Sequence, residues 1–289
     1  MIKALLKTMR PRQWVKNVIV FFALVFDKQL FQLEPALRTL AGFALFSLIS
    51  SAVYIFNDIS DIDADRQHPE KKHRPLPSGE LPVGVARVFG IFLVAIVLPS
   101  AWLLTPAFAT VLAIYFLMML AYSSRLKHIP ILDVMILAAG FVLRVHSGVT
   151  LIEVERFSPW LYVITTLGAL YLGFGKRRAE LTLLVDGAGS HRKVLEGYTI
   201  PLLDQYITIV SGTTIVAYSL YTFTAPNVPD NHAMMLTIPF VIYAIFRYLY
   251  LVQISQVTGS PEEIVLTDRP LQIAIALWGI VVMAVFYLS

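Results

Sequence analysis

The chain of 289 residues contains no cysteine, which excludes disulfide bonds and thiolate chemistry. Charged residues are also scarce, at 15% of the chain, too few for a soluble domain of this length. The net charge of +4 is modest and scattered, so the composition argues against nucleic-acid binding. The basic start, Met1 to Lys16, lacks the short apolar core and cleavage site of a signal peptide, and we expect none.

Hydrophobic residues are abundant, at 57% of the chain with a mean hydropathy of +0.71. Nine apolar runs approach the roughly 20 residues that a helix needs to cross a bilayer. They lie near 17–33, 36–56, 83–104, 106–125, 130–151, 158–175, 199–224, 234–252 and 270–288, and Asp27 and Lys28 interrupt the first. We therefore expect an all-α integral membrane bundle of about nine transmembrane helices. It would be a single transmembrane catalytic domain over 1–289, with an interfacial segment at 1–16.

Basic residues are concentrated in alternate connections, which predicts the orientation in the membrane. With the N-terminus inside, the inside segments are the N-terminus, 57–82, 125–130, 176–198 and 253–269. They hold Lys3, Lys7, Arg10, Arg12, Lys16, Arg66, Lys71, Lys72, Arg74, Arg125, Lys127, Lys176, Arg177, Arg178, Arg192, Lys193 and Arg269. The opposite loops hold only Lys28, Arg38 and Arg156. We expect a multi-pass protein of the cell (inner) membrane whose polar cavity and active site face the cytoplasm.

An acidic stretch, residues 57–65, follows the second apolar run and carries most of the chemistry. If the helix continues, Asp58, Asp61 and Asp65 stand at i, i+3 and i+7 and share one face, whereas Asp63 points away. Carboxylate oxygens suit hard cations, and Mg²⁺ often completes its shell with phosphate oxygens. The alternative is a solvated acidic helix end, but unpaired carboxylates are costly near lipid. We therefore predict a metal–diphosphate site at the membrane surface.

Basic residues in the same inside segment supply candidate anion ligands. Arg74 lies among prolines and a glycine that stop a helix, and it is the better candidate for a phosphate ligand. For Lys71 and Lys72 alone, the ordinary bias of inside loops is the favoured explanation.

Two further inside segments are rich in polar groups. Asp133 opens an apolar helix, where it could equally be a cap. Arg144 lies well inside the fifth run, where it could neutralise a carboxylate or meet a lipid phosphate. On a continuing helix, Lys176 and Glu180 are i, i+4 neighbours and Arg177 reaches the same face. That group is either a surface ion pair of small energy or an anion site, and we favour the anion site.

The pattern Asn57-Asp58-x-x-Asp61-x-x-x-Asp65, with its His68-Pro69 and Arg74-Pro75 continuation, resembles the first aspartate motif of the UbiA superfamily of intramembrane prenyltransferases. The segment from Tyr122 through Lys127 to Asp133 resembles another recurring segment of that superfamily. Nine spans match its fold, and the resemblance covers nearly the whole chain.

The chain departs from aromatic prenyltransferases of that superfamily, which carry a second aspartate-rich motif after the sixth span. Here that loop offers Lys176, Arg177, Arg178 and Glu180, with Asp186 isolated further along. Together with the opening segment 10–17, this is similar to the decaprenyl-phosphate phosphoribosyltransferase branch. The resemblance implies transfer of 5-phosphoribose from phosphoribosyl diphosphate (PRPP) to polyprenyl (decaprenyl) phosphate. The enzyme would be an Mg-dependent glycosyltransferase acting in cell-wall arabinan precursor synthesis.

The resemblance also implies roles for residues. Asp58, Asp61 and Asp65, steadied by Asn57, would hold Mg²⁺ on the diphosphate of PRPP. The substrate-binding candidates are Lys16, Arg74, Tyr122, Lys127, Asp133, Lys176, Arg177 and Glu180. Among these, Lys16, Lys127 and Arg74 would meet the lipid phosphate or the diphosphate. Lys176 and Arg177 would grip another anionic end of PRPP, and Glu180 would orient them or a ribose hydroxyl.

The expected partners are PRPP, the lipid substrate and the membrane. We expect no nucleic acid, and an oligomer of the same chain is possible. The alternative enzyme transfers an isoprenoid from a prenyl diphosphate to an aromatic acceptor. A transporter is the non-enzyme alternative, but the charges cluster in loops and no inverted repeat is visible.

The charge asymmetry gives the first testable prediction, since the chain has no cysteine of its own. A Ser78→Cys variant should not react with a membrane-impermeant thiol reagent in intact cells, because 57–82 is expected to be cytoplasmic. A Ser289→Cys variant is the positive control, because the C-terminus is expected on the opposite side. Efficient labelling of Ser78→Cys from outside would overturn the orientation.

Overall fold

The computed structural model is helical, without strands in the part of the chain it describes. The described residues are 1–68, 71–155, 158–185, 193–253, 264–265 and 267–288. Pro69, Arg156, Asp186, Arg192 and Ser289, named above, lie outside them. The prediction of an all-α membrane protein is therefore confirmed for the fold class.

Seven of the described helices are long and apolar enough to cross a membrane. They are Leu33–Ser60, Val83–Leu104, Pro106–Ser124, Leu132–Val149, Ile200–Thr224, Ala233–Gln253 and Arg269–Tyr287. These match seven of the predicted spans, and the chain is a multi-pass membrane protein. The sixth predicted span corresponds to a 26-residue helix, α8 (Trp160–Val185), which continues beyond the predicted end at 175. A count of nine spans stays a prediction.

The first predicted span, near 17–33, has a different local structure. A 3-10 helix, η1 (Pro11–Phe21), runs into a five-residue helix, α2 (Phe22–Phe26), and Lys28 takes a positive φ of 57° just beyond it. Two polar contacts join η1 to the helix Leu33–Ser60. Trp14 Nε1 donates to Ser51 Oγ at 3.0 Å, and Asn17 Nδ2 donates to Ser47 Oγ at 3.0 Å.

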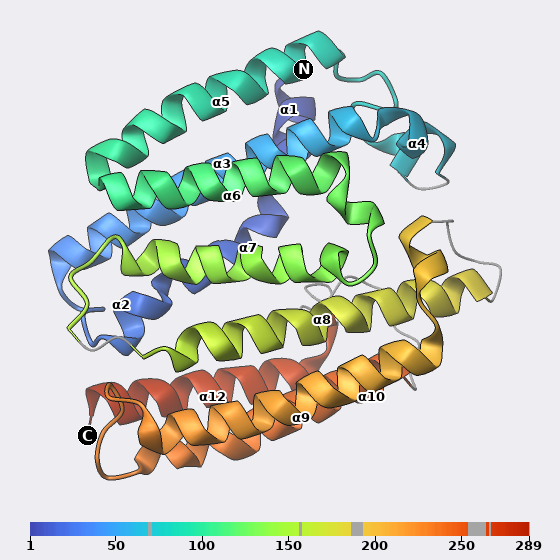
Figure 1. The fold of residues 1–289 in the computed structure, drawn as a ribbon. Coiled ribbons are helices and arrows are strands. Elements are labelled where there is room, and N and C mark those ends of the chain that lie inside the picture. Colours follow the sequence, from blue (N-terminus) through green and yellow to red (C-terminus); the bar gives the residue numbers. More distant parts are fainter. Residues whose placement is uncertain (69–70, 156–157, 186–192, 254–263, 266, 289) are drawn as a thin grey trace. The chain divides into compact units, whose positions relative to one another are not determined.

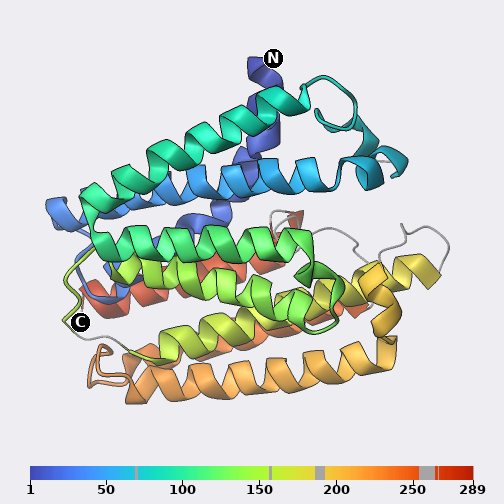
Figure 2. The same cartoon turned by 45° about the horizontal axis from the view of Figure 1, so that its top comes forward.

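The chain divides into two compact units, with the boundary inside α7 (Leu132–Val149). Unit 1 comprises Met1–Val25, Gln29–Ile129 and Leu143–Val154. Besides η1 and α2 it contains α1 (Ile2–Met9), α3 (Leu33–Ser60), α4 (Ile62–Gln67), η2 (Lys71–His73), α5 (Val83–Leu104), α6 (Pro106–Ser124) and η3 (Leu126–His128). Helices α3, α5 and α6 pack side by side (Figure 1), and Figure 2 shows the same neighbours from a second direction.

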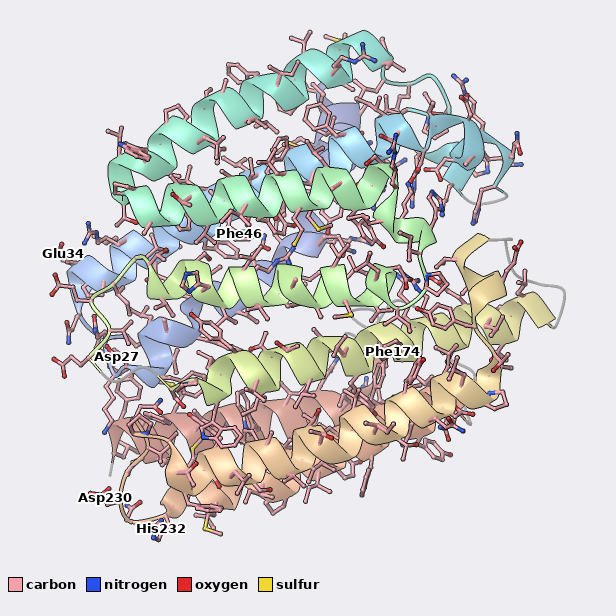
Figure 3. The ribbon with its side chains drawn as sticks, in the orientation of Figure 1. Asp27, Glu34, Phe46, Phe174, Asp230 and His232 are labelled. Atoms are coloured by element: carbon pink, nitrogen blue, oxygen red, sulfur yellow. The ribbon has the colours of Figure 1, made fainter. Side chains whose placement is uncertain are left out.

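Apolar side chains between α3 and α6 form the main core of unit 1. Phe46, labelled in Figure 3, is fully buried there, with its ring centroid 4.8 Å from that of Tyr115. Helix α3 is apolar along most of its length, and burial of apolar side chains favours a place inside the unit. Accordingly, 56% of its most apolar window is buried.

Unit 2 comprises Phe26–Lys28, Pro130–Val142 and Glu155–Ser289. Besides α8 it contains η4 (Lys193–Gly197), α9 (Ile200–Thr224), η5 (Ala233–Thr237), α10 (Ile238–Gln253) and α12 (Arg269–Tyr287). Helix α8 packs along α9, and α10 packs against α8, α9 and α12 (Figures 1 and 2). The ring centroid of Phe174 of α8, which is labelled in Figure 3, lies 5.1 Å from that of Tyr206 of α9, and the two rings are tilted by 45°.

Three helices begin with a capping side chain followed by proline, as helix starts commonly do. Thr105 accepts a hydrogen bond from the backbone of Phe108 at the start of α6. Thr199 does the same for α9 and Asp268 for α12. These caps fix where each apolar helix starts and so where the polar connections between helices begin.

Close packing of α7 against η1 within unit 1 gives the second prediction. A Cβ atom at Gly148 would lie 2.0 Å from the carbonyl oxygen of Val20. Gly148→Ala should therefore lower the apparent Tm of the purified protein by several degrees, in line with an overpacking cost of about 1–3 kcal/mol.

Gly212→Ala is the matched control, because a Cβ there meets nothing within 4 Å on α9. It should keep or raise the apparent Tm, since alanine favours helix over glycine. Equal Tm values for the two variants, measured by tryptophan fluorescence in detergent, would contradict the close contact.

Candidate active site

The acidic stretch lies where α3 ends, and it is interrupted by a one-residue break. Helix α3 ends at Ser60, Asp61 takes φ −98° and ψ 5°, and α4 begins at Ile62. The three carboxylates are thus distributed over two helices and the residue between them. The three carboxylates therefore do not share one continuous helical face, and only Asp58 and Asp65 come together.

Asp58 and Asp65 converge on one cation. The Nη1 atom of Arg74 lies 3.4 Å from Oδ1 of Asp58 and 2.7 Å from Oδ2 of Asp65. Both carboxylates are buried. Asp63 points away, as predicted: its side chain is 87% exposed and pairs with Arg66, three residues on.

Three more cations contact the same carboxylates. Arg10 pairs with Asp58, and Lys127 pairs with Asp61. Lys71 Nζ lies 3.8 Å from Oδ1 of Asp65. Each of the three carboxylates therefore contacts at least one cation. Such pairing is expected, because a charge in low-dielectric surroundings is costly unless it is paired.

The donor set suits a hard divalent cation in its chemistry, since carboxylate oxygens of this kind hold Mg²⁺. In the arrangement described, however, no three His, Cys, Asp or Glu side chains among the described residues are gathered closely enough to hold a metal ion. The carboxylates are instead turned toward the arginines and lysines. A bound metal would have to replace some of these cations.

Arg144, for which two partners were considered, is held by uncharged groups in unit 1. It is 6% exposed, its Nε donates to Asn17 Oδ1 at 2.8 Å, and its Nη2 donates to the Tyr115 hydroxyl at 2.8 Å. The guanidinium also lies over the rings of Phe46 and Tyr115, with its carbon 5.4 and 4.9 Å from their centroids. In these contacts Arg144 fastens η1 to α6 and α7, because Asn17 lies in η1.

The basic segment of α8 forms a separate site in unit 2. Arg177 is buried, with Nε 2.6 Å from Oδ2 of Asp133 and Nη1 2.6 Å from Oε2 of Glu180. Lys176 is partly exposed on the same helix. Arg178 pairs with Asp204 of α9 at 2.6 Å. The segment is helical as the i, i+4 hypothesis required, but Arg177 meets carboxylates rather than solvent.

Tyr198 completes this cluster. Its hydroxyl donates to Oδ1 of Asp133 at 2.7 Å and accepts a hydrogen bond from the backbone N–H of Ile131. Burial and the hydrogen bond to Asp133 raise the pKa of Tyr198, so the hydroxyl stays protonated and remains a donor. The hydrogen bonds described for the Asp133 carboxylate run to Arg177 and Tyr198 rather than to its own helix start.

Comparison with known proteins assigns the family. The model of the UbiA prenyltransferase family matches residues 18–258. This chain belongs to the UbiA prenyltransferase family. The acidic stretch and the basic segment of α8 both lie within the matched residues of this UbiA-family protein.

Curated relatives extend the likeness to almost the full chain. Decaprenyl-phosphate phosphoribosyltransferase of Mycobacterium tuberculosis (strain H37Rv) is 34% identical over 282 residues, covering 96% of this chain and 92% of that protein. The protein of the same name from Corynebacterium glutamicum is 33% identical over 290 residues, covering 98% and 86%. A solved UbiA homologue from Archaeoglobus fulgidus, bound to GPP and Mg²⁺, has a TM-score of 0.73 at 20% identity and covers 98% of this chain and 99% of its own. At that identity the likeness shows the fold alone.

The structure of this UbiA-family protein brings two sets of predicted residues together. Asp58, Asp61 and Asp65 meet Arg74 and Lys127 in unit 1, while Asp133, Arg177 and Glu180 meet in unit 2. Asn57 sits in the last turn of α3, beside Asp58. Lys16 lies in η1, and Tyr122 is buried near the end of α6. The substrate contacts assigned to these residues stay predictions.

Two residues in these clusters were not identified from the sequence. Arg10 was counted in the inside charge and in the opening segment 10–17 but was given no role in the site, yet it pairs with Asp58, 48 positions along the chain. Tyr198 had no signal in its own segment, because its partner Asp133 is 65 positions away. The one local hint for Arg10 is the proline that follows it, which separates it from the apolar run.

Proposed function

We propose that this protein transfers 5-phosphoribose from PRPP to a polyprenyl phosphate, releasing diphosphate. The observation that carries the proposal is the 34% identity, over 96% of this chain, to a decaprenyl-phosphate phosphoribosyltransferase. The basic segment of α8 supports it, because PRPP has a 5-phosphate that a prenyl diphosphate lacks. A role in cell-wall arabinan precursor synthesis and the length of the lipid stay predictions.

The acidic stretch is assigned to the diphosphate. Asp58, Asp61 and Asp65 would hold Mg²⁺, with Asn57 as a neutral oxygen donor beside them. When bound, Mg²⁺ supplies neutralisation of the diphosphate charge and so makes it a better leaving group. Arg74 bridges Asp58 and Asp65. We assign its guanidinium to a phosphate oxygen of the same diphosphate, because guanidinium groups bind phosphate strongly.

Other cations of unit 1 are assigned to phosphate groups without a choice among them. Lys127 pairs with Asp61 in the middle of the acidic stretch, and Arg10 pairs with Asp58 near its start. Lys16 and Tyr122 are proposed to contact the diphosphate or the lipid phosphate. A phosphate monoester is ionised at neutral pH and attacks C1 of the ribose without a strong protein base. The chain therefore has to position two anions rather than to remove a proton.

In unit 2 we assign Lys176 to the 5-phosphate of PRPP. Its ammonium group is a compact charge that can meet phosphate oxygens from several directions. Arg177 was predicted to share this role, but its Nε and Nη1 atoms donate to Asp133 and Glu180. Arg177 is also buried, so we assign the direct phosphate contact to the partly exposed Lys176 alone.

The second candidate is transfer of an isoprenoid from a prenyl diphosphate to an aromatic acceptor. It is favoured by the family assignment, because the matching model is that of the UbiA prenyltransferase family. It needs no cationic site for a second phosphate. An active site facing the cytoplasm and an oligomer of the same chain stay proposals under either function.

The third prediction tests the donor. Purified protein in lipid nanodiscs should convert labelled PRPP and polyprenyl phosphate, and Lys176→Ala should raise KM for PRPP about ten- to a hundredfold, the range for one charge-assisted contact to phosphate. KM for polyprenyl phosphate should change much less.

Lys72→Ala is the matched control, because Lys72 is an exposed cation of unit 1 to which no substrate contact is assigned. It should leave both KM values unchanged. Turnover of a prenyl diphosphate with an aromatic acid, and none with PRPP, would establish the second candidate instead.

The fourth prediction tests the acidic stretch. Asp58→Ala, Asp61→Ala or Asp65→Ala should lower kcat by roughly 10²–10³-fold or more, the usual cost of removing one group that stabilises developing charge. Chelation with EDTA should abolish turnover of the unaltered protein, and added Mg²⁺ should restore it.

Asp63→Ala serves as the control, because its side chain is 87% exposed and contacts Arg66 on the same helix. Its Mg²⁺-dependent rate should stay close to that of the unaltered protein. Near-normal rates for Asp61→Ala would refute the assignment of this stretch to the metal and diphosphate.

A further inference from the structure

Four side chains of unit 2 form a hydrogen-bonded network that includes one accessible carboxylate. Tyr198 donates to Asp133, Asp133 accepts from Arg177, and Arg177 donates to Glu180. The side chains of Asp133 and Arg177 are 0% and 2% exposed, whereas that of Glu180 is 28% exposed. Among the four, Glu180 is therefore the member that a ligand can reach.

The backbone that carries Asp133 is held in a strained shape. Ile131 has a φ of +69°, which is unfavourable for a β-branched residue. Tyr198 holds it there by accepting the Ile131 N–H. Gly197 lies against Pro130, where a Cβ would come within 2.3 Å of the proline ring. Such strain persists only where surrounding contacts fix it, and it is found most often at functional sites.

The pairing of Arg177 is better explained by orientation than by stability. Burying an ion pair costs desolvation free energy that roughly cancels its attraction, so such pairs add little net stability. A planar guanidinium, however, fixes the directions of the two carboxylates that it binds. Asp133 neutralises the single charge of Arg177, and Glu180 is the second carboxylate on the same guanidinium. The accessible carboxylate of Glu180 is therefore an oriented hydrogen-bond acceptor.

We propose that Tyr198, Asp133 and Arg177 are positioning residues that orient Glu180 to accept a hydrogen bond from a ring hydroxyl of the donor sugar. This proposal rests on the proposed function, and it makes the protein specific for a donor that carries a hydroxyl group. An isoprenoid donor has no hydroxyl to offer Glu180 and would leave its carboxylate without that bond. A site built to bind a hydroxyl discriminates strongly against analogues that lack it.

The protonation state of Tyr198 fits this role. Because burial raises its pKa, the hydroxyl remains a donor to Asp133 throughout the neutral range. Its ring belongs to the buried core of unit 2, so the hydroxyl cannot turn to solvent without repacking. The two hydrogen bonds of this one hydroxyl connect the strained backbone to the carboxylate that holds Arg177.

The experiment measures discrimination between donors. The full-length protein in nanodiscs is assayed with PRPP, with its 2-deoxy analogue and with its 3-deoxy analogue, and kcat/KM ratios are compared. The unaltered protein should favour PRPP over at least one analogue by about ten- to a hundredfold, the range for a hydrogen bond to a charged group. Glu180→Ala should reduce that ratio to near one. Tyr198→Phe should reduce it about threefold or more, a smaller effect than that of Glu180→Ala, because Tyr198 acts on Glu180 only through Asp133 and Arg177.

The ratio separates positioning from a merely structural role, because it does not depend on the fraction of folded protein. Tyr171→Phe is the matched control: Tyr171 is a buried tyrosine of α8 whose hydroxyl donates to the carbonyl of Ile245. It should leave the ratio unchanged. In the double variant of Glu180→Ala and Tyr198→Phe, the second change should have no further effect on the ratio, since both act through one group.

Two outcomes would overturn the inference: no discrimination by the unaltered protein, or full discrimination by Glu180→Ala. If Tyr198→Phe shows no turnover, the same ratio is taken from dissociation constants for the donors measured by calorimetry, and an unchanged ratio would again overturn it. Absence of any PRPP turnover by the unaltered protein would refute the proposed function instead, so the two failures are distinguishable.

Discussion

The cost of an unpaired charge beside hydrocarbon is the constraint on which both clusters depend. Asp58, Asp65 and Asp133 are buried, and each contacts an arginine. A lone carboxylate in such surroundings would cost several kcal/mol or would become protonated. The positions of the acidic residues therefore determine where cations must lie. Arg74 is nine positions from Asp65, whereas Arg10 and Arg177 are 48 and 44 positions from Asp58 and Asp133.

Under the proposed function, these pairs would also prepare the acidic stretch for ligands. A phosphate that entered beside Arg74 would meet a guanidinium already held by two carboxylates, so little side-chain freedom would be lost on binding. A divalent cation would take carboxylate oxygens that arginine and lysine now occupy. Its binding and the transfer of those cations to an anion would therefore support one another, because each charge keeps a partner of opposite sign throughout.

Local pattern predicted the parts of the fold that local forces determine. Seven of the nine apolar runs correspond to described helices that are long and apolar enough to cross a membrane, because burial of apolar side chains in lipid needs only the run itself. The spacing of Asp63 predicted its exposure, because helical geometry alone decides it. The partners of buried charges were not predictable in the same way. Arg10 and Asp58 are separated by 48 positions, and no local pattern favours the positive φ of Ile131.

The basic segment of α8 shows why residue type decides more than charge. Lys176 and Arg177 are adjacent cations, and from the sequence both were assigned to a phosphate. The guanidinium of Arg177 has the planar fork that two carboxylates require, so Asp133 and Glu180 bind it inside unit 2. An ammonium group could not fix both carboxylates in direction. The contacts that bury Arg177 thus also orient Glu180, and under the proposed function the segment would distinguish a donor by a hydroxyl as well as by charge.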